Sequence, residues 1–114
     1  MKPFIQVMKA LSDPSRVKIM KMLGAKELCV CELTALLGLA QSTVSKHLKI
    51  LEDAGLVEFW KEGAWVNYRL ATGKQSPYAA VMLQQVAEWL NDDPAIRDLL
   101  DQLPTVDRLR INVV

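Results

Sequence analysis

The stretch of sequence that decides the fold is CVCELTALLGLAQSTVSKHLKIL, at residues 29–51. Its apolar residues recur at helical spacing on both sides of a break, with Leu33, Leu36 and Leu37 before it and Val44, Leu48 and Leu51 after it. This spacing predicts two helices, at 29–37 and 41–54. The break between them is the tight turn Gly38-Leu39-Ala40. Two short helices joined by a three-residue turn with glycine are typical of a helix-turn-helix.

Two further segments, at 56–61 and 65–70, are rich in β-branched and aromatic residues, and Glu62-Gly63-Ala64 lies between them. This pattern predicts a β-hairpin. A hairpin that directly follows a helix-turn-helix forms the wing of a winged helix. The predicted fold class is therefore mainly α with one β-hairpin, a winged helix-turn-helix.

Helices are also expected on both sides of this unit. A short apolar helix covers about 3–11, and Ser12-Asp13-Pro14 supplies the cap and the first-turn proline of the next one. After the hairpin, Ser76 caps a longer helix. We therefore assign residues 1–92 to a winged helix-turn-helix domain for DNA binding and dimerisation, and residues 93–114 to a C-terminal short helix and tail.

The helix that begins at Ser76 is more apolar than a surface helix of a small monomer needs. A domain of 114 residues buries only about 60–68% of the surface that its unfolded chain exposes, so pairing with a second copy would stabilise it. We expect a homodimer held mainly by the helices at 3–11 and 76–90.

The formal net charge is only +1, but the charges are unevenly distributed. Residues 1–87 carry 11 Lys and Arg against 7 Asp and Glu, whereas residues 88–114 carry 3 against 6. The helix-turn-helix lies in the positive part. No run of 18 apolar residues exists, so we expect no membrane partner and a cytoplasmic protein whose thiols stay reduced.

The helix at 41–54 has a polar face suited to double-stranded DNA. Its candidate DNA-binding residues are Gln41, Ser42, Thr43, Ser45, Lys46 and His47, and Lys61 in the hairpin joins them. Hydroxyl, amide and cationic groups reach phosphate oxygens and base edges in a major groove. The alternative is an ordinary solvated helix, which the preceding helix and the following hairpin disfavour. The single His could also be a metal ligand, but it has no Cys or carboxylate at ligand spacing on its face.

The two cysteines of the chain, Cys29 and Cys31, stand at the start of the helix at 29–37. A helix N-terminus favours the thiolate, and thiolates select soft ions. At spacing i, i+2 the pair makes a poor disulfide, and on a regular helix the two side chains point to nearly opposite faces. A shared ion would therefore open the first turn of that helix. The alternative is two small buried apolar residues.

Four motifs together resemble the ArsR-type (ArsR/SmtB) metalloregulatory repressors: ALSDPSR at 10–16, ELCVCEL at 27–33, QSTVSKHL at 41–48 and GAWVNYRL at 63–70. They cover roughly residues 4–90. The resemblance implies a homodimeric winged-helix repressor that leaves its operator DNA, an inverted repeat, when it binds metal. The C-V-C motif resembles the arsenite-sensing branch, which implies As(III) or Sb(III) as inducer at Cys29 and Cys31, with no organic cofactor.

The match to that branch is incomplete. A third cysteine commonly follows in it, at the position held here by Thr34. A cadmium- and lead-sensing branch shares the C-V-C piece but adds N-terminal cysteines, which this chain lacks. The zinc- and nickel-sensing branches use His on the helix matching 76–92, where this chain has none. A solvent hydroxide or a small exogenous thiol is the expected third ligand.

The cysteine pair is compatible with two other classes of function. In the same fold, oxidation of the cysteine pair could switch the repressor in place of metal binding. An enzyme such as a dithiol oxidoreductase is disfavoured, because the sequence has no C-x-x-C motif and no Ser/His/Asp or paired-carboxylate arrangement.

Overall fold

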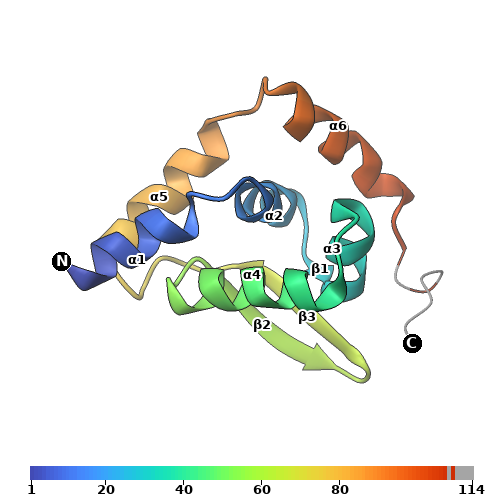
Figure 1. Cartoon of the computed structure of the whole chain (residues 1–114), viewed down its shortest axis with the longest axis horizontal. Coiled ribbons are helices and arrows are strands. Elements are labelled where there is room, and N and C mark those ends of the chain that lie inside the picture. The colour runs from blue at the N-terminus through green and yellow to red at the C-terminus, as the bar shows by residue number, and fades with distance from the viewer. Residues whose placement is uncertain (108, 110–114) are drawn as a thin grey trace.

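The computed structural model describes residues 1–107 and 109. The helices in chain order are α1 (Lys2–Ala10), α2 (Pro14–Ala25), α3 (Val30–Leu37), α4 (Gln41–Asp53), α5 (Pro77–Glu88) and α6 (Pro94–Gln102), followed by the short 3₁₀ helix η1 (Leu103–Thr105). The strands are β1 (Leu28–Cys29), β2 (Val57–Glu62) and β3 (Trp65–Leu70). The predicted winged helix-turn-helix is confirmed (Figure 1).

The helix-turn-helix consists of α3 and α4. Gly38 ends α3 with a positive φ of 68°, a backbone conformation that glycine adopts without strain. Leu33, Val44, Leu48 and Leu51 are all fully buried, as their helical spacing predicts. The shared core fixes the face that α4 presents to solvent.

The wing is the β2–β3 hairpin, paired from Val57↔Leu70 to Glu62↔Trp65. A third strand, β1, pairs antiparallel with β3 through Leu28↔Tyr68 and Cys29↔Asn67, which gives the sheet order β1-β3-β2. The prediction that the helix of the first cysteine begins at residue 29 is therefore wrong. Cys29 is the last residue of a strand, and the helix begins at Val30.

The helices α1 and α5 lie side by side at the end of the molecule away from the hairpin tip (Figure 1). The rings of Phe4 and Tyr78 meet edge to face, with their centroids 5.4 Å apart. Several apolar side chains of this pair of helices are exposed: Phe4, Ile5, Tyr78 and Val81. These four residues are called here the α1–α5 apolar face.

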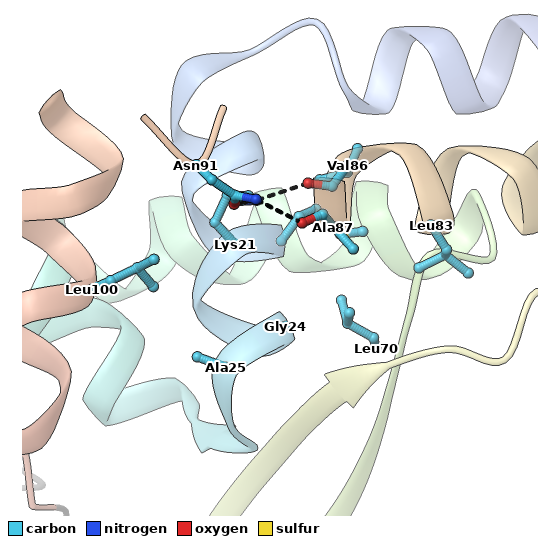
Figure 2. Close-up of a pocket in the computed structure, with 10 residues that line it drawn as sticks. Lys21, Gly24, Ala25, Leu70, Leu83, Val86, Ala87, Asn91 and Leu100 are labelled. Atoms are coloured by element: carbon cyan, nitrogen blue, oxygen red, sulfur yellow. Dashed lines mark hydrogen bonds between the residues drawn. The ribbon is translucent and has the colours of Figure 1, made fainter. Parts of the chain in front are cut away.

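The C-terminal end of α5 is held by a buried lysine of α2 (Figure 2). The Lys21 ammonium donates to the carbonyl oxygens of Val86 and Trp89, both at 2.8 Å, and to Oδ1 of Asn91 at 2.7 Å. Lys21 is only 7% exposed, and burial lowers its pKa. A cation among the last carbonyl groups of a helix also complements the helix dipole. No local pattern in the sequence points to Lys21.

The helix α6 packs against α2, and Leu99 of α6 and Leu103 of η1 belong to the same core as the winged helix. The division of the chain at residue 92 stays a prediction. Residues 108 and 110–114 of the predicted tail lie outside the described residues. Within the described part of the chain, no helix has the length and apolar character needed to cross a membrane.

Candidate nucleic-acid interface and thiol site

The outer face of α4 carries the side chains that the sequence predicts for DNA contact. The exposed ones are Gln41, Ser42, Thr43, Ser45 and Lys46, and Lys61 is exposed on β2. Ala40 precedes the helix and makes no side-chain capping hydrogen bond. Lys49 is on this helix too, but it forms ion pairs with Asp53 at 3.1 Å and Glu52 at 3.7 Å. The hydrogen bond to Asp53 raises the pKa of Lys49, and these carboxylates reduce its value as a phosphate contact.

His47 is half-buried, and Arg16 of α2 fixes the orientation of its ring. The Arg16 Nη1 lies 3.1 Å from Nδ1 of His47, while its Nε and Nη2 donate to the carbonyl oxygens of Ala10 (2.7 Å) and Lys9 (3.1 Å). A guanidinium only donates, so Nδ1 of a neutral His47 is the acceptor and Nε2 carries the proton. Arg16 thus connects the end of α1 to the DNA-facing helix. Sequence reasoning missed this link because the two residues are 31 positions apart.

The structure joins Cys29 and Cys31 in a disulfide, with their Cα atoms 5.4 Å apart. The predictions of free thiols and of side chains on opposite faces are therefore wrong for this state of the pair. The physical reason is that Cys29 precedes the helix in extended conformation, with φ −82° and ψ 164°. The angular offset of a regular helix does not apply to it. Two sulfur atoms in one place can hold one soft ion without opening α3, once they are reduced.

Cys29 is also the N-cap of α3. Its Sγ accepts a hydrogen bond from the backbone N–H of Glu32 at 3.4 Å, and its own N–H donates to Oε1 of Glu32 at 2.9 Å. This reciprocal pair is a capping box in which a cysteine stands where serine or threonine is usual. Glu32 is only 7% exposed. The sulfur that would bind a ligand therefore stabilises the first helix of the helix-turn-helix.

A cavity of about 320 Å³ opens beside the cysteine pair. The residues that line it include Cys29, Cys31 and Thr34, together with Gln41 and Ser45 of α4 and Trp65 and Tyr68 of β3. The sulfur site and the DNA-facing helix therefore share one cavity. The Thr34 hydroxyl oxygen is buried and has no hydrogen-bond partner. Among the described residues, no three His, Cys, Asp or Glu side chains gather where they could hold a metal ion.

Known proteins resemble this chain in sequence and in structure. The family described as "Bacterial regulatory protein, arsR family" matches residues 13–58. The arsenical resistance operon repressor of Escherichia coli (strain K12) is 43% identical over 59% of this chain, which spans only 58% of that repressor. The arsenic resistance transcriptional regulator ArsR2 of Pseudomonas putida is 34% identical, with 89% of this chain and 91% of the regulator covered.

Among solved structures, one similar chain is the homodimeric winged helix-turn-helix DNA-binding domain (fragment 1–100) of a possible ArsR-family transcriptional regulator from Mycobacterium bovis. The TM-score is 0.62 at 31% identity, with 76% of this chain and 80% of the other covered. These relatives and structural neighbours are described as regulators of transcription, and none of them is an enzyme.

Proposed function

The chain belongs to the ArsR family of bacterial regulatory proteins, and from this membership we propose that it is a homodimeric transcriptional repressor that leaves its operator when As(III) or Sb(III) binds Cys29 and Cys31. One observation carries the proposal: the cysteine pair and two candidate DNA-binding residues, Gln41 and Ser45, line the same cavity. A ligand at the sulfur atoms therefore lies against the helix that would read DNA. We propose the cytoplasm as its location, because operator DNA and reduced thiols are found there.

On the DNA side, α4 enters a major groove and the hairpin follows the backbone beside it. Lys46 and Lys61 meet phosphates, which fixes position without reading sequence. Gln41, Ser42 and Thr43 at the N-terminal end of α4 contact base edges, as does His47 through its Nε2–H. Arg16 keeps the His47 ring in the tautomer that offers this donor.

The second copy covers the α1–α5 apolar face. Two reading helices related by a two-fold axis lie about 34 Å apart, which is one turn of DNA. The operator is accordingly an inverted repeat. Arg16 holds the C-terminal carbonyl groups of α1 and also His47, so the dimer helix and the reading helix are mechanically connected.

The sensing reaction begins with the reduced pair, so a thiol reductant must first open the disulfide. Arsenous acid, As(OH)₃, then exchanges two of its hydroxyl groups for the two cysteine sulfurs. Two As–S bonds form, two As–O bonds break, and the two thiol protons leave in two water molecules. The Cys29 sulfur that acquires an As–S bond becomes a poorer acceptor for the N–H of Glu32, so the cap of α3 weakens. We infer that α3 then shifts against α4, to which it is packed.

The experiment has two stages. A pool of random duplexes is selected with the reduced protein, and the bound sequences are eluted with arsenite. The proposal predicts enrichment of one inverted repeat that arsenite releases and that added salt also weakens. A pool without an enriched repeat would remove the DNA-binding part of the proposal, whereas a repeat that arsenite does not release would remove the sensing part.

A second candidate function is switching by thiol oxidation, and the disulfide itself favours it. In that case the bonded form and the dithiol form differ in operator affinity without any metal. Mild oxidant would convert two thiols to one disulfide, with the loss of two hydrogen atoms by mass, and the operator affinity would change at the same time. Equal affinity of both forms would leave metal binding as the signal.

A further inference from the structure

We propose that Thr34 determines the ligand specificity of the cysteine site, by donating a hydrogen bond to an oxygen atom that completes the coordination of trivalent arsenic. This inference rests on the proposed function, because it assigns a third contact to the same site.

The cysteine site supplies fewer ligands than trivalent arsenic needs. Trivalent arsenic forms three bonds, and the chain has only two cysteines. The other residues that line the cavity are Val30, Thr34, Ala35, Gln41, Ser45, Ala64, Trp65, Val66 and Tyr68. None of them carries a thiol, an imidazole or a carboxylate, and neutral hydroxyls and amides are poor ligands for a soft ion. The third ligand therefore comes from outside the chain, as a small thiol or as the hydroxyl group that arsenous acid brings with it, and the inference concerns the hydroxyl group.

The hydroxyl group of Thr34 makes no hydrogen bond. A threonine within a helix commonly bonds the carbonyl oxygen one turn earlier. Thr34 does not, and its buried Oγ1 has no partner. Buried polar groups are normally paired, so an unpaired one calls for an explanation. No hydrogen bond fixes the present rotamer of Thr34, and the hydroxyl is free to turn toward a ligand in the cavity that the residue lines.

Thr34 is close to the cysteine pair. Thr34 lies three residues after Cys31 on α3, so the two side chains are neighbours on the same helix face. Cys29, Cys31 and Thr34 all line the cavity. Arsenic held by these sulfurs would therefore place its remaining oxygen in the same cavity of about 320 Å³ that Thr34 lines. After the exchange described above, that oxygen is the one hydroxyl group that arsenous acid retains.

The test compares two ligands that differ only at the third bond. Arsenous acid keeps a hydroxyl there, whereas phenylarsonous acid, PhAs(OH)₂, loses both hydroxyls to the sulfurs and keeps its phenyl carbon. Binding of each to the reduced, DNA-free protein is measured by calorimetry. The variants are Thr34→Val, which keeps the shape but lacks the hydroxyl, and Thr34→Ser, which keeps the hydroxyl.

Thr34→Val should weaken arsenite binding about tenfold, which is the loss of one hydrogen bond to a ligand. The affinity of the same variant for phenylarsonous acid should stay within about twofold of that of the unchanged protein. Thr34→Ser should bind both ligands with the affinity of the unchanged protein. An equal loss for both ligands in Thr34→Val would show a structural role and overturn the inference. Unchanged arsenite binding in Thr34→Val would overturn it too.

The proposed function fails by a different result. The cysteine site is not a sensor if the unchanged reduced protein binds neither arsenous acid nor phenylarsonous acid. The same conclusion follows if the Cys29→Ser variant binds both ligands as tightly as the unchanged protein. The Thr34 comparison is decided only in a protein that passes this control, so the two failures are distinguishable.

Discussion

Replacing Lys21 with Met should destabilise the protein by removing the charge that holds the end of α5 to α2. Methionine keeps most of the apolar stem, so the substitution isolates the ammonium. The carbonyl oxygens of Val86 and Trp89 lose donors at 2.8 Å, and Asn91 loses one at 2.7 Å. Leu90, between Trp89 and Asn91, has a positive φ of 65°. This conformation costs a non-glycine residue energy and needs support from its surroundings.

The magnitude follows from opposing terms. A hydrogen bond to a charged group contributes about 1.5–3 kcal/mol, and the favourable position at a helix C-terminus adds about 0.3–1 kcal/mol. Against this, the lowered pKa of Lys21 indicates that burial already disfavours its charged form, and removing the ammonium recovers that cost. Because Trp89 is 53% exposed, water can replace part of what its carbonyl group loses. We expect a net loss of about 2–3 kcal/mol.

Urea unfolding at pH 7 and one fixed protein concentration measures this loss, because the stability of a dimer depends on concentration. Lys18→Met, on the same helix but partly exposed, is the matched control and should change the free energy of unfolding by less than about 0.5 kcal/mol. A Lys21→Met variant as stable as the unchanged protein would refute the role assigned to this lysine.

Three further predictions concern DNA, the dimer and pH. Lys46→Ala should weaken binding to every duplex and lower the salt dependence, whereas Ser42→Ala should also change sequence preference in a binding selection; identical profiles for the two would contradict their roles. Val81→Asp should give a monomer by sedimentation and lose tight operator binding, while Gln102→Asp, at an exposed site on α6, should remain a dimer; a dimeric Val81→Asp would exclude the α1–α5 apolar face as the interface. Asp13→Ala should cost about 1 kcal/mol at pH 7 by thermal unfolding. Burial raises the pKa of Asp13, but the hydrogen bonds from the N–H groups of Arg16 and Ser15 outweigh it, so the folded pKa lies below the ordinary value of 3.8. The stability that Asp13 contributes is therefore present above pH 3.8 and lost as the pH falls through the folded pKa, and a stability difference that stays constant across that range would refute this role.

The elements of the winged helix could be predicted because each has a local signal. Leu33, Val44, Leu48 and Leu51 repeat at helical spacing and are all buried, so α3 and α4 follow from periodicity alone. The hairpin follows from two β-rich segments around Gly63, whose positive φ of 59° the turn requires. Such signals need no knowledge of the rest of the chain.

The strand β1 could not be predicted, because it is only two residues long and exists through its pairing with β3. This two-residue strand determines the geometry of the sulfur site. With Cys29 placed in a helix, the two cysteines would diverge, whereas its extended backbone brings their sulfurs together. The geometry of the site thus depends on a strand contact between residues 29 and 67.

Helix faces were only partly predictable on α5, where apolar residues occur on most sides. Leu83 lines a cavity with Lys21 and Val86, whereas Val81 is 53% exposed. The Lys21 cap and the Arg16–His47 contact both join residues far apart in sequence. Long-range polar contacts of this kind leave no periodic pattern.

The most direct test of the proposed sensing mechanism is a titration with As(III) of the complex between the reduced protein and its operator. Fluorescence anisotropy of the labelled duplex measures how much protein stays bound. Sb(III), Cd(II), Pb(II) and Zn(II) are titrated in parallel. The Cys29→Ser/Cys31→Ser variant is the control, and it should bind the operator as tightly as the unchanged protein. We predict that As(III) and Sb(III) release the unchanged protein and not the variant. For release, the ligand must bind the DNA-free form more tightly, and a hundredfold preference supplies about 2.7 kcal/mol per site. Release of the double variant by arsenite at the same concentration would contradict the assignment of Cys29 and Cys31 as the sensing site.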